Sequence, residues 1–268
     1  MRTGVKTGPW GWSFAELERS WEAAEEVGFN ILACFDHVTA GPKEAASWDA
    51  PALLAAMAAR TSRITLAARV LNVCLRHVFL LAGQLAVVQA LSGGRLDVGL
   101  GAGSFGLARH DHIALTIPFP GIGDRMARLD AACRVLPALW GGERVTDQSL
   151  GLSGASLGPI GVASPRLVVG GASERAVAIA ARYCEGLNLS TANPDEVTDA
   201  RRLAERFCFD LGRPAPIAVE AQLWVRDLWP DARSHLQAFE ASGAEAVILV
   251  LDEQRGANEV RRLADRVL

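Results

Sequence analysis

The sequence predicts an α/β protein of the (β/α)8 TIM-barrel class, with residues 1–268 forming a single domain. The first observation is that short apolar runs alternate with amphipathic helical segments along almost the whole chain. The second is that this alternation yields eight strand–helix repeats, which suits closure into a barrel. The third is that runs such as residues 246–251 are continuously apolar, as in parallel strands buried on both faces. The chain length also matches the roughly 250 residues that one such barrel needs.

The first half of the chain opens with a short strand expected near Val5. Ser13 and Glu16 have the spacing of a capping box, which predicts a helix that runs to about residue 27 and ends at Gly28. Pro51 suits the first turn of a helix, where its missing N–H costs no hydrogen bond. Strands are expected at 31–35, 64–70 and 96–100, and further helices at 51–60, 80–91 and 125–140.

The second half repeats the pattern after the longest expected loop, residues 141–166, which is rich in Gly, Ser and Pro. Asn193 and Pro194, followed by two acidic residues, are typical of the start of a helix. Strands are expected at 167–169, 186–189, 217–225 and 246–251, and helices at 173–183, 194–211 and 231–242 and at the end of the chain.

Composition disfavours several classes of protein. The 27 basic and 30 acidic residues nearly balance, which argues against nucleic-acid binding. No run of about 18 apolar residues occurs, so we expect no membrane span, and the first residues lack the apolar core of a signal peptide. The five cysteines are widely spaced with no Cys-x-x-Cys, which indicates free thiols of a reducing cytoplasm.

Asp36 and His37 form the first candidate site. They directly follow the expected strand at 31–35, and active sites of (β/α)8 barrels lie where strands end and βα loops begin. There His37 would transfer a proton or hydrogen-bond a substrate oxygen, with Asp36 orienting it or touching a cofactor. The alternative interpretation is an exposed histidine beside a helix cap.

Residues 99–106 read GLGAGSFG and contain a Gly-x-Gly-x-x-Gly motif after an expected strand. A dinucleotide-binding interpretation is disfavoured, because Pro118 and Pro120 follow in place of an immediate long helix and no acidic residue ends a following strand. Gly101 and Gly103 instead predict a close approach of backbone to a flat ring or a substrate.

Two further stretches carry the residue types of a binding site. Residues 170–173, GGAS, end a strand and open a helix, which suits a phosphate at the helix N-terminus or, alternatively, a tight turn. His110, Asp111 and His112, with Asp36 and His37 as partners, have metal-ligand chemistry. A His-x-His in an expected loop is more typical of a solvated loop, so we expect no metal site.

Several stretches match, in order, the luciferase-like monooxygenase superfamily, which the chain resembles as a whole. They are EVGFN at 26–30 leading to Asp36 and His37, TSRI at 61–64 with VLN at 70–72, LSGGRL at 91–96 running into GLGAG at 99–103, and VVGGAS at 168–173. This superfamily includes bacterial luciferase and oxidoreductases that use coenzyme F420.

The resemblance implies a TIM barrel that pairs as a homodimer and binds a cofactor across its C-terminal mouth. That cofactor would be coenzyme F420 or, alternatively, FMN. Residues 69–71 would form a bulge, often with a non-prolyl cis peptide. The GGAS turn would bind the phosphate group of the cofactor. The resemblance implies His37 and Asp36 as catalytic residues, and as cofactor-binding residues Asp36, Val70, Leu71, Asn72, Gly101, Gly103, Gly170, Gly171, Ala172 and Ser173.

The implied function is hydride transfer between F420 and a small organic substrate such as a carbonyl, an imine or an activated alkene. Alternatives are a reduced-FMN-dependent monooxygenase, a non-catalytic cofactor-binding or partner subunit, and a metal-dependent barrel hydrolase. Ser104 and Phe105 stand where the family commonly has an acidic or aromatic residue, which weakens the transfer of a carboxylate acid catalyst to this chain.

Overall fold

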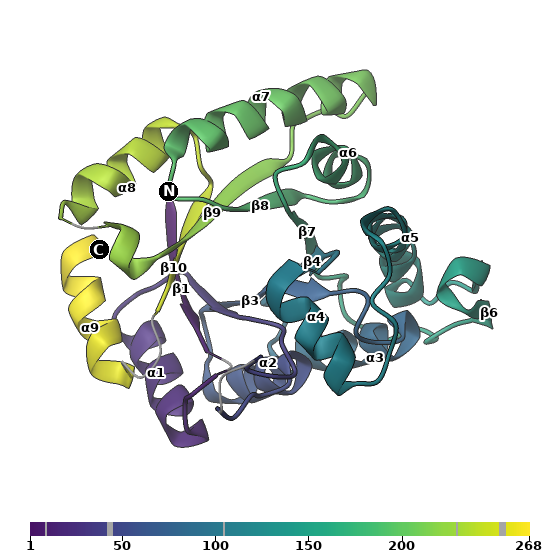
Figure 1. Cartoon of the computed structure of the whole chain (residues 1–268), viewed down its shortest axis with the longest axis horizontal. Coiled ribbons are helices and arrows are strands. Elements are labelled where there is room, and N and C mark those ends of the chain that lie inside the picture. Colours follow the sequence, from purple (N-terminus) through teal and green to yellow (C-terminus); the bar gives the residue numbers. More distant parts are fainter. Residues whose placement is uncertain (9, 42–44, 104, 229, 252–255) are drawn as a thin grey trace.

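The computed structural model describes residues 1–268 except 9, 42–44, 104, 229 and 252–255. Within this described part, eight parallel strands close into a barrel in the order β1-β10-β9-β8-β7-β4-β3-β2 (Figure 1). The strands are β1 (Arg2–Thr7), β2 (Ile31–Cys34), β3 (Thr65–Asn72), β4 (Leu96–Gly101), β7 (Arg166–Gly170), β8 (Gly186–Ser190), β9 (Ala218–Trp224) and β10 (Ala246–Val250). The predicted fold class is confirmed.

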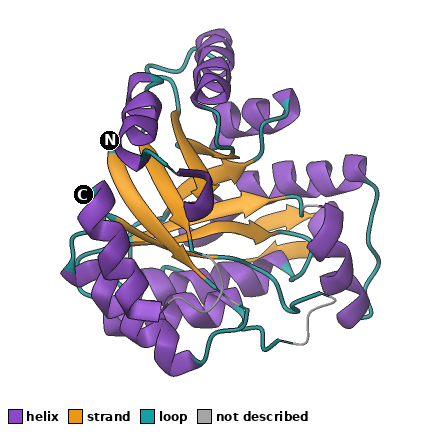
Figure 2. Ribbon diagram, turned by 60° about the vertical axis from the view of Figure 1, so that its left-hand side comes forward, coloured by secondary structure: helices purple, strands orange, loops and turns teal. Residues whose placement is uncertain are grey.

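Helices surround the strands, which lie at the centre of the molecule (Figure 2). The helices that connect successive barrel strands, together with the last helix, are α1 (Phe14–Glu26), α2 (Ala50–Arg60), α3 (Val78–Leu91), α5 (Ile122–Trp140), α6 (Glu174–Tyr183), α7 (Pro194–Asp210), α8 (Ala232–Ala241) and α9 (Gly256–Val267). No helix among the described residues is both long and apolar enough to cross a membrane.

Local sequence signals explain where several helices begin. The capping box predicted at the start of α1 is present, because the Ser13 side chain accepts from the Glu16 N–H and the Glu16 carboxylate accepts from the Ser13 N–H. Asp49 caps α2 ahead of Pro51, and Asn193 caps α7 ahead of Pro194. Each cap satisfies backbone N–H groups that have no partner inside the helix.

Two segments expected to be loops have regular structure. The stretch 105–114, which includes both histidines of the His-x-His motif, forms helix α4 (Phe105–Ala114) between β4 and α5. The stretch 141–166 contains an antiparallel hairpin of β5 (Val145–Asp147) and β6 (Leu152–Ala155). Both expectations were wrong because neither segment has a clear hydrophobic period, so tertiary packing decides its structure.

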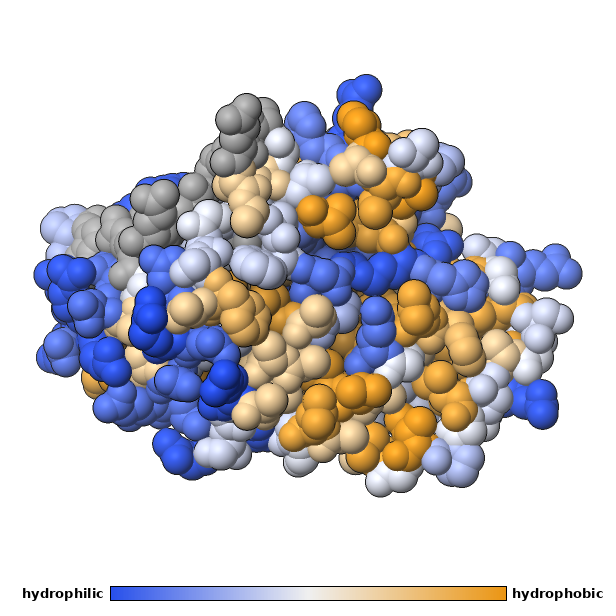
Figure 3. All heavy atoms as spheres, turned by 90° about the horizontal axis from the view of Figure 1, so that it is seen from below, coloured by the Kyte–Doolittle hydropathy of each residue, from blue (hydrophilic) through white to orange (hydrophobic). Residues whose placement is uncertain are grey.

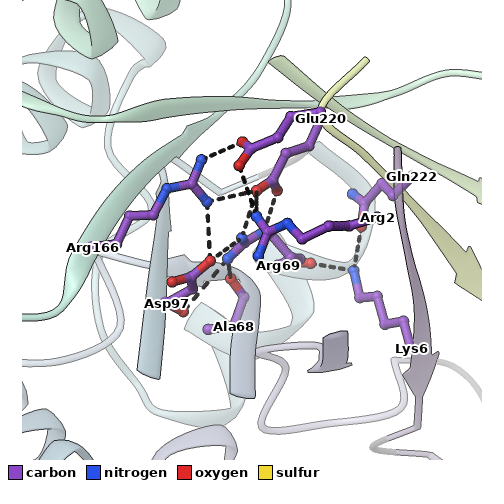
Figure 4. Close-up of polar contacts among 9 residues, drawn as sticks. Arg2, Lys6, Ala68, Arg69, Asp97, Arg166, Glu220 and Gln222 are labelled. Carbon is purple, nitrogen blue, oxygen red and sulfur yellow. Dashed lines mark hydrogen bonds and ion pairs between the residues drawn. The ribbon is translucent and has the colours of Figure 1, made fainter. Parts of the chain in front are cut away.

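The barrel interior is divided between apolar and charged side chains. Small apolar residues fill the side formed by β1, β2, β3 and β10, namely Ile31, Ala33, Ala67, Ala246 and Ile248. On the other side Arg69, Asp97, Arg166 and Glu220 form ion pairs with one another (Figure 4). Glu220 is fully buried; although burial alone would raise its pKa, Arg69 and Arg166 hold that pKa down at about 2. Arg69 anchors this charged cluster to β3, the strand whose end carries part of the candidate site.

Candidate functional site at the C-terminal mouth

Most of the candidate residues lie at the mouth of the barrel where strands end. Asp36 and His37 follow β2, Asn72 and Gly101 are the last residues of β3 and β4, and Gly170 is the last residue of β7. This end of a (β/α)8 barrel is where catalytic residues from different strands come together. The structure therefore brings residues that are far apart in the sequence to one face.

The bulge expected in β3 is present. The register between β3 and β4 shifts between Ala68 and Leu71, and the Arg69–Val70 peptide bond is cis. The Arg69 carbonyl, which belongs to this peptide, accepts a hydrogen bond from the buried ammonium of Lys6 on β1 (Figure 4). The backbone at the bulge is therefore connected through a side chain to β1, a strand that does not pair with β3.

Glycines on β4 and β7 make room for the Val70 side chain. A Cβ at Gly101 would lie 2.6 Å from Val70 Cγ2, and one at Gly170 would lie 2.9 Å from both Val70 methyl groups. Gly103, with a φ of +78°, would place a Cβ 2.8 Å from the Asn72 amide nitrogen. These glycines are thus required by the packing of β3 itself, a reason that the sequence interpretation did not include.

Asp36 connects β2 to the end of β3. Its Oδ2 accepts hydrogen bonds from the Asn72 N–H at 2.9 Å and from the Arg76 guanidinium at 2.8 Å. Burial raises the pKa of Asp36, although Arg76 and the Asn72 N–H act in the opposite direction. Of the two roles expected for Asp36, orienting His37 finds no support in these contacts, which direct its carboxylate toward β3, whereas the contact with a cofactor stays a prediction.

Asp111 orients His37, and sequence reasoning missed this role. Its Oδ2 lies 2.7 Å from His37 Nδ1, and its Oδ1 accepts from the N–H groups of Val38 and Thr39 at 2.9 and 3.0 Å. Asp111 is fully buried, whereas His37 is partly exposed. A carboxylate fixed in this way selects the imidazole tautomer that carries its proton on Nδ1 and leaves Nε2 as the reactive nitrogen.

The His-x-His motif does not assemble with Asp36 and His37 as metal ligands. His110 is exposed on α4, while His112 is buried and its Nδ1 lies 2.6 Å from the Pro118 carbonyl. No group of three metal-ligating side chains occurs among the residues that the structure describes. The alternative of a metal-dependent hydrolase therefore has no support from this geometry.

The GGAS turn connects β7 to α6. The Gly171 N–H donates to the Asn188 carbonyl at 3.0 Å, and Gly171 has a φ of +136°, a value that favours glycine. Ser173 is the N-cap of α6, and Ala172 and Ser173 are exposed. The N-terminus of this ten-residue helix faces solvent beside the barrel mouth, where its dipole favours an anion.

Two buried polar atoms at the mouth fit a flat heterocyclic cofactor. Within the described part of the chain no hydrogen-bond partner reaches Asp36 Oδ1 or Asn72 Nδ2, and both side chains are at least 95% buried. Since orphaned buried polar groups are costly, they commonly pair with a ligand. The Asp36 oxygen is an acceptor and the Asn72 nitrogen is a donor, and the two residues are hydrogen-bonded to each other. Together they would complement a ring edge that carries N–H and C=O groups.

A row of aromatic side chains lies at the mouth where β1, β2 and β9 end. Trp10, Phe35 and Trp224 follow or end β1, β2 and β9, with ring centroids 5.3 Å apart for the first pair and 6.2 Å for the second. His37 lies 5.0 Å from Trp10, at one end of the row. His37 thus lies between the Trp10 ring of this row and the carboxylate of Asp111.

These observations define a class: a (β/α)8 barrel protein whose mouth combines a buttressed histidine, a bulged strand and unpaired polar groups suited to a planar cofactor. The chain belongs to the luciferase-like monooxygenase family, whose sequence model matches residues 2–266. The family predicted from the residues is therefore confirmed.

The chain is similar to curated F420-dependent glucose-6-phosphate dehydrogenases over part of their length. The protein of Beutenbergia cavernae is 33% identical over 150 residues, which cover 54% of this chain and 43% of that protein. The protein of Microbacterium testaceum is 26% identical over 181 residues, or 66% of this chain and 53% of that protein. The chain thus spans about half the length of these relatives.

Solved structures are similar over nearly the whole chain. An F420-dependent secondary alcohol dehydrogenase in complex with an F420-acetone adduct has a TM-score of 0.83 at 15% identity, covering 99% of this chain and 98% of that one. The monooxygenase RslO1 from Streptomyces bottropensis has a TM-score of 0.77 at 20% identity, with the same coverage. At these identities the likeness concerns the fold.

Proposed function

We propose that this protein is an F420-dependent oxidoreductase that transfers a hydride to or from a small organic substrate. The observation that carries the proposal is the β3 bulge. Its residue Val70 packs against glycines of β4 and β7, and the hydrogen-bonded pair of Asp36 and Asn72 lies at the end of the same strand. The F420-dependence of the curated relatives supports the choice of cofactor. We further propose that residues 1–268 act as one domain. We also propose a cytoplasmic location, which the five free cysteines support.

Each part of the mouth has a role in this proposal. When bound, F420 supplies the hydride chemistry, and the protein supplies position and electrostatics. Asp36 and Asn72 bind one edge of the ring, Val70 supports its face, and residues 170–173 hold the phosphate. His37 moves a proton at Nε2 to or from the substrate oxygen or nitrogen, with Asp111 fixing its tautomer.

The aromatic row indicates which substrates to test first. Trp10, Phe35 and Trp224 offer apolar faces that exclude water from the substrate side of the mouth. We therefore propose apolar carbonyl, imine or activated alkene substrates. A phosphorylated sugar, the substrate in the names of the curated relatives, is a second class to include in the same screen.

The test is a titration of the purified protein with F420 and with FMN, oxidised and reduced, followed by fluorescence. Asp36→Asn is expected to weaken F420 binding about tenfold, because a charged acceptor is lost at a buried position. Asp49→Asn is the matched control, since Asp49 also pairs with Arg76 but its side chain is 44% exposed and caps α2. Preference for reduced FMN, or equal effects of both variants, would contradict the proposal.

We also propose that the protein is a homodimer formed through α3. This helix is apolar on most sides, and Leu80, Val87 and Leu91 are 56–58% exposed on it. Their spacing of seven and four residues places them on one face. Figure 3 shows apolar residues across the centre and right of the surface that lies at the bottom of Figure 1, the part of the molecule with α2, α3 and α4. Burial of such a face in a subunit interface would remove it from water.

A further inference from the structure

Lys6 is the unusual residue of the barrel interior. The chain has two lysines, Lys6 and Lys43, against 25 arginines, so lysine is rare where a cation is needed. Lys6 is 1% exposed and lies near the end of β1, above the ion pairs of Arg69 and Glu220. A buried ammonium is costly unless specific partners stabilise it, so its contacts indicate its role.

The ammonium of Lys6 contacts residues of β3 and β9 and the residue that directly follows β2. It donates to the Arg69 carbonyl in the β3 bulge and, at 2.7 Å, to Gln222 Oε1 on β9 (Figure 4). It also lies 3.7 Å from the centre of the Phe35 ring, directly after β2, in a cation–π contact. Lys6 therefore joins the bulge that carries Val70 to the central ring of the aromatic row.

A compact cation suits this position better than a guanidinium. Ammonium is a point charge with three donors on a flexible stem, whereas the planar fork of arginine matches flat carboxylates. The three partners here lie in different directions, and two of them are neutral oxygen atoms of β3 and β9. By contrast, Arg69 meets the carboxylate of Glu220 with two nitrogens, at 2.7 and 3.0 Å.

We propose that Lys6 is a positioning residue, whose ammonium fixes the β3 bulge and Phe35 relative to each other and so sets Val70 and the aromatic row for cofactor and substrate. This inference rests on the proposed function for its consequence in binding. Its structural part, the coupling of Lys6 to Val70, is measurable without any cofactor.

The charge of Lys6 is open to titration near neutral pH. Burial lowers its pKa to about 7, and the charge of Arg69 on β3 acts in the same direction. Burial raises the pKa of the Cys34 thiol on β2 to about 12, so that thiol stays neutral around pH 7. Gln222 and Phe35, the other partners, carry no charge. Raising the pH through 7 therefore removes the ammonium while its neighbours keep their charge states.

The first experiment follows the protein by NMR with lysine labelled at Cε and valine labelled at its methyl groups. Two lysine signals are expected, and the one lost in Lys6→Met belongs to Lys6. In the wild type the Val70 methyl signals, assigned with Val70→Ala, should shift with the same midpoint as Lys6, near pH 7. In Lys6→Met the Val70 signals should no longer show this midpoint, although the ionisable groups of Asp36 and His37 are still present.

A second variant keeps the test decisive if Lys6→Met does not fold. Gln222→Glu places a carboxylate 2.7 Å from the position of the ammonium, which favours the charged form of Lys6. The midpoints of Lys6 and Val70 should then rise together. The proposal would be overturned if the Val70 methyl signals do not shift as Lys6 titrates, in the wild type and in this variant.

The second experiment measures F420 affinity by fluorescence between pH 6 and 9. Lys6→Met is expected to bind about tenfold more weakly than the wild type at pH 6 and to lose the weakening that the wild type shows above pH 7. Arg2→Met removes a cation from the same strand that pairs with Glu245, and it should change the affinity by less than about twofold. Wild-type affinity in Lys6→Met would overturn the positioning role. If the wild type binds no F420, the proposed function fails and the Val70 signals alone decide the role of Lys6.

Discussion

Asp111 illustrates what a single residue contributes to this site. Its carboxylate is fully buried and accepts from four donors: the His37 ring, two backbone N–H groups of the loop after β2 and, at 3.4 Å, the Thr39 hydroxyl. The sequence interpretation placed His37 correctly at the end of a strand, but it grouped Asp111 with the two flanking histidines as a metal motif. The helical periodicity of α4 is weak, so the direction of each side chain in 110–112 could not be read from the sequence.

We expect Asp111→Ala to destabilise the protein by about 2–4 kcal/mol, because four donors lose a buried charged acceptor. Asp111→Asn should cost less, since one carbonyl oxygen remains to accept. Urea denaturation measures both. His37→Ala is the comparison, because it removes one of the four contacts and leaves the loop N–H groups paired. Equal losses for Asp111→Ala and His37→Ala would show that the backbone contacts contribute little.

At the scale of elements, β3, β4 and β7 act together as a support for Val70. The sequence interpretation predicted these strands and the glycines that end them, because apolar runs and strand-to-loop glycines are local signals. It assigned Gly101 to the approach of a ring. The structure shows that the same glycine also admits the side chain of a neighbouring strand, a contact between residues 31 positions apart that no local pattern reveals.

Gly101→Ala should destabilise the protein by about 1–3 kcal/mol, because the added methyl overlaps Val70 Cγ2. In the double variant with Val70→Ala, the cost should be clearly less than the sum of the two single costs. Gly99→Ala provides the control, since its Cβ would also meet the backbone carbonyl of Ala68, which Val70→Ala cannot remove. Thermal or urea unfolding of the three single variants and of the two double variants, in which Gly101→Ala or Gly99→Ala is combined with Val70→Ala, gives the coupling energies. Additive costs for Gly101→Ala and Val70→Ala would contradict this packing.

At the scale of the whole molecule, charged residues inside the barrel make its stability depend on pH. The pKa of Glu220 is about 2 in the folded protein, below its ordinary value of 4.5. As the pH falls, the unfolded chain takes up this proton first, so the stabilisation is complete above about 4.5 and is lost toward 2. Sequence reasoning predicted a barrel but not this interior, because side chains alternate along every strand and only the pairing of the strands decides which of the two faces points inward.

Glu220→Gln should be less stable than the wild type at pH 7, because Arg69 and Arg166 lose a charged partner. The difference between the two proteins should shrink as the pH falls from 4.5 to 2. Denaturant unfolding at a series of pH values measures this. Glu25→Gln is the control, since Glu25 also has a pKa of about 2 but contacts backbone N–H groups at the surface. A constant difference between wild type and Glu220→Gln would contradict the expected linkage.

The proposed dimer is tested by charges placed on α3. Leu80→Glu combined with Val87→Glu should convert the protein to monomers, because charges are costly in an apolar subunit interface. Phe209→Glu is the control, since Phe209 is 82% exposed on α7. Sedimentation velocity distinguishes the two states. A wild-type protein that sediments as a monomer would rule out this interface.

The pairing of β1 with both β2 and β10 has a consequence for the protein during its synthesis. The first strand can pair with β2 early, but its other edge is completed only by residues 246–250. While the ribosome makes the intervening chain, that edge offers unpaired backbone groups to any neighbouring strand. The unpaired edge of β1 therefore stays open to wrong pairing until residues 246–250 have been made and can close the barrel.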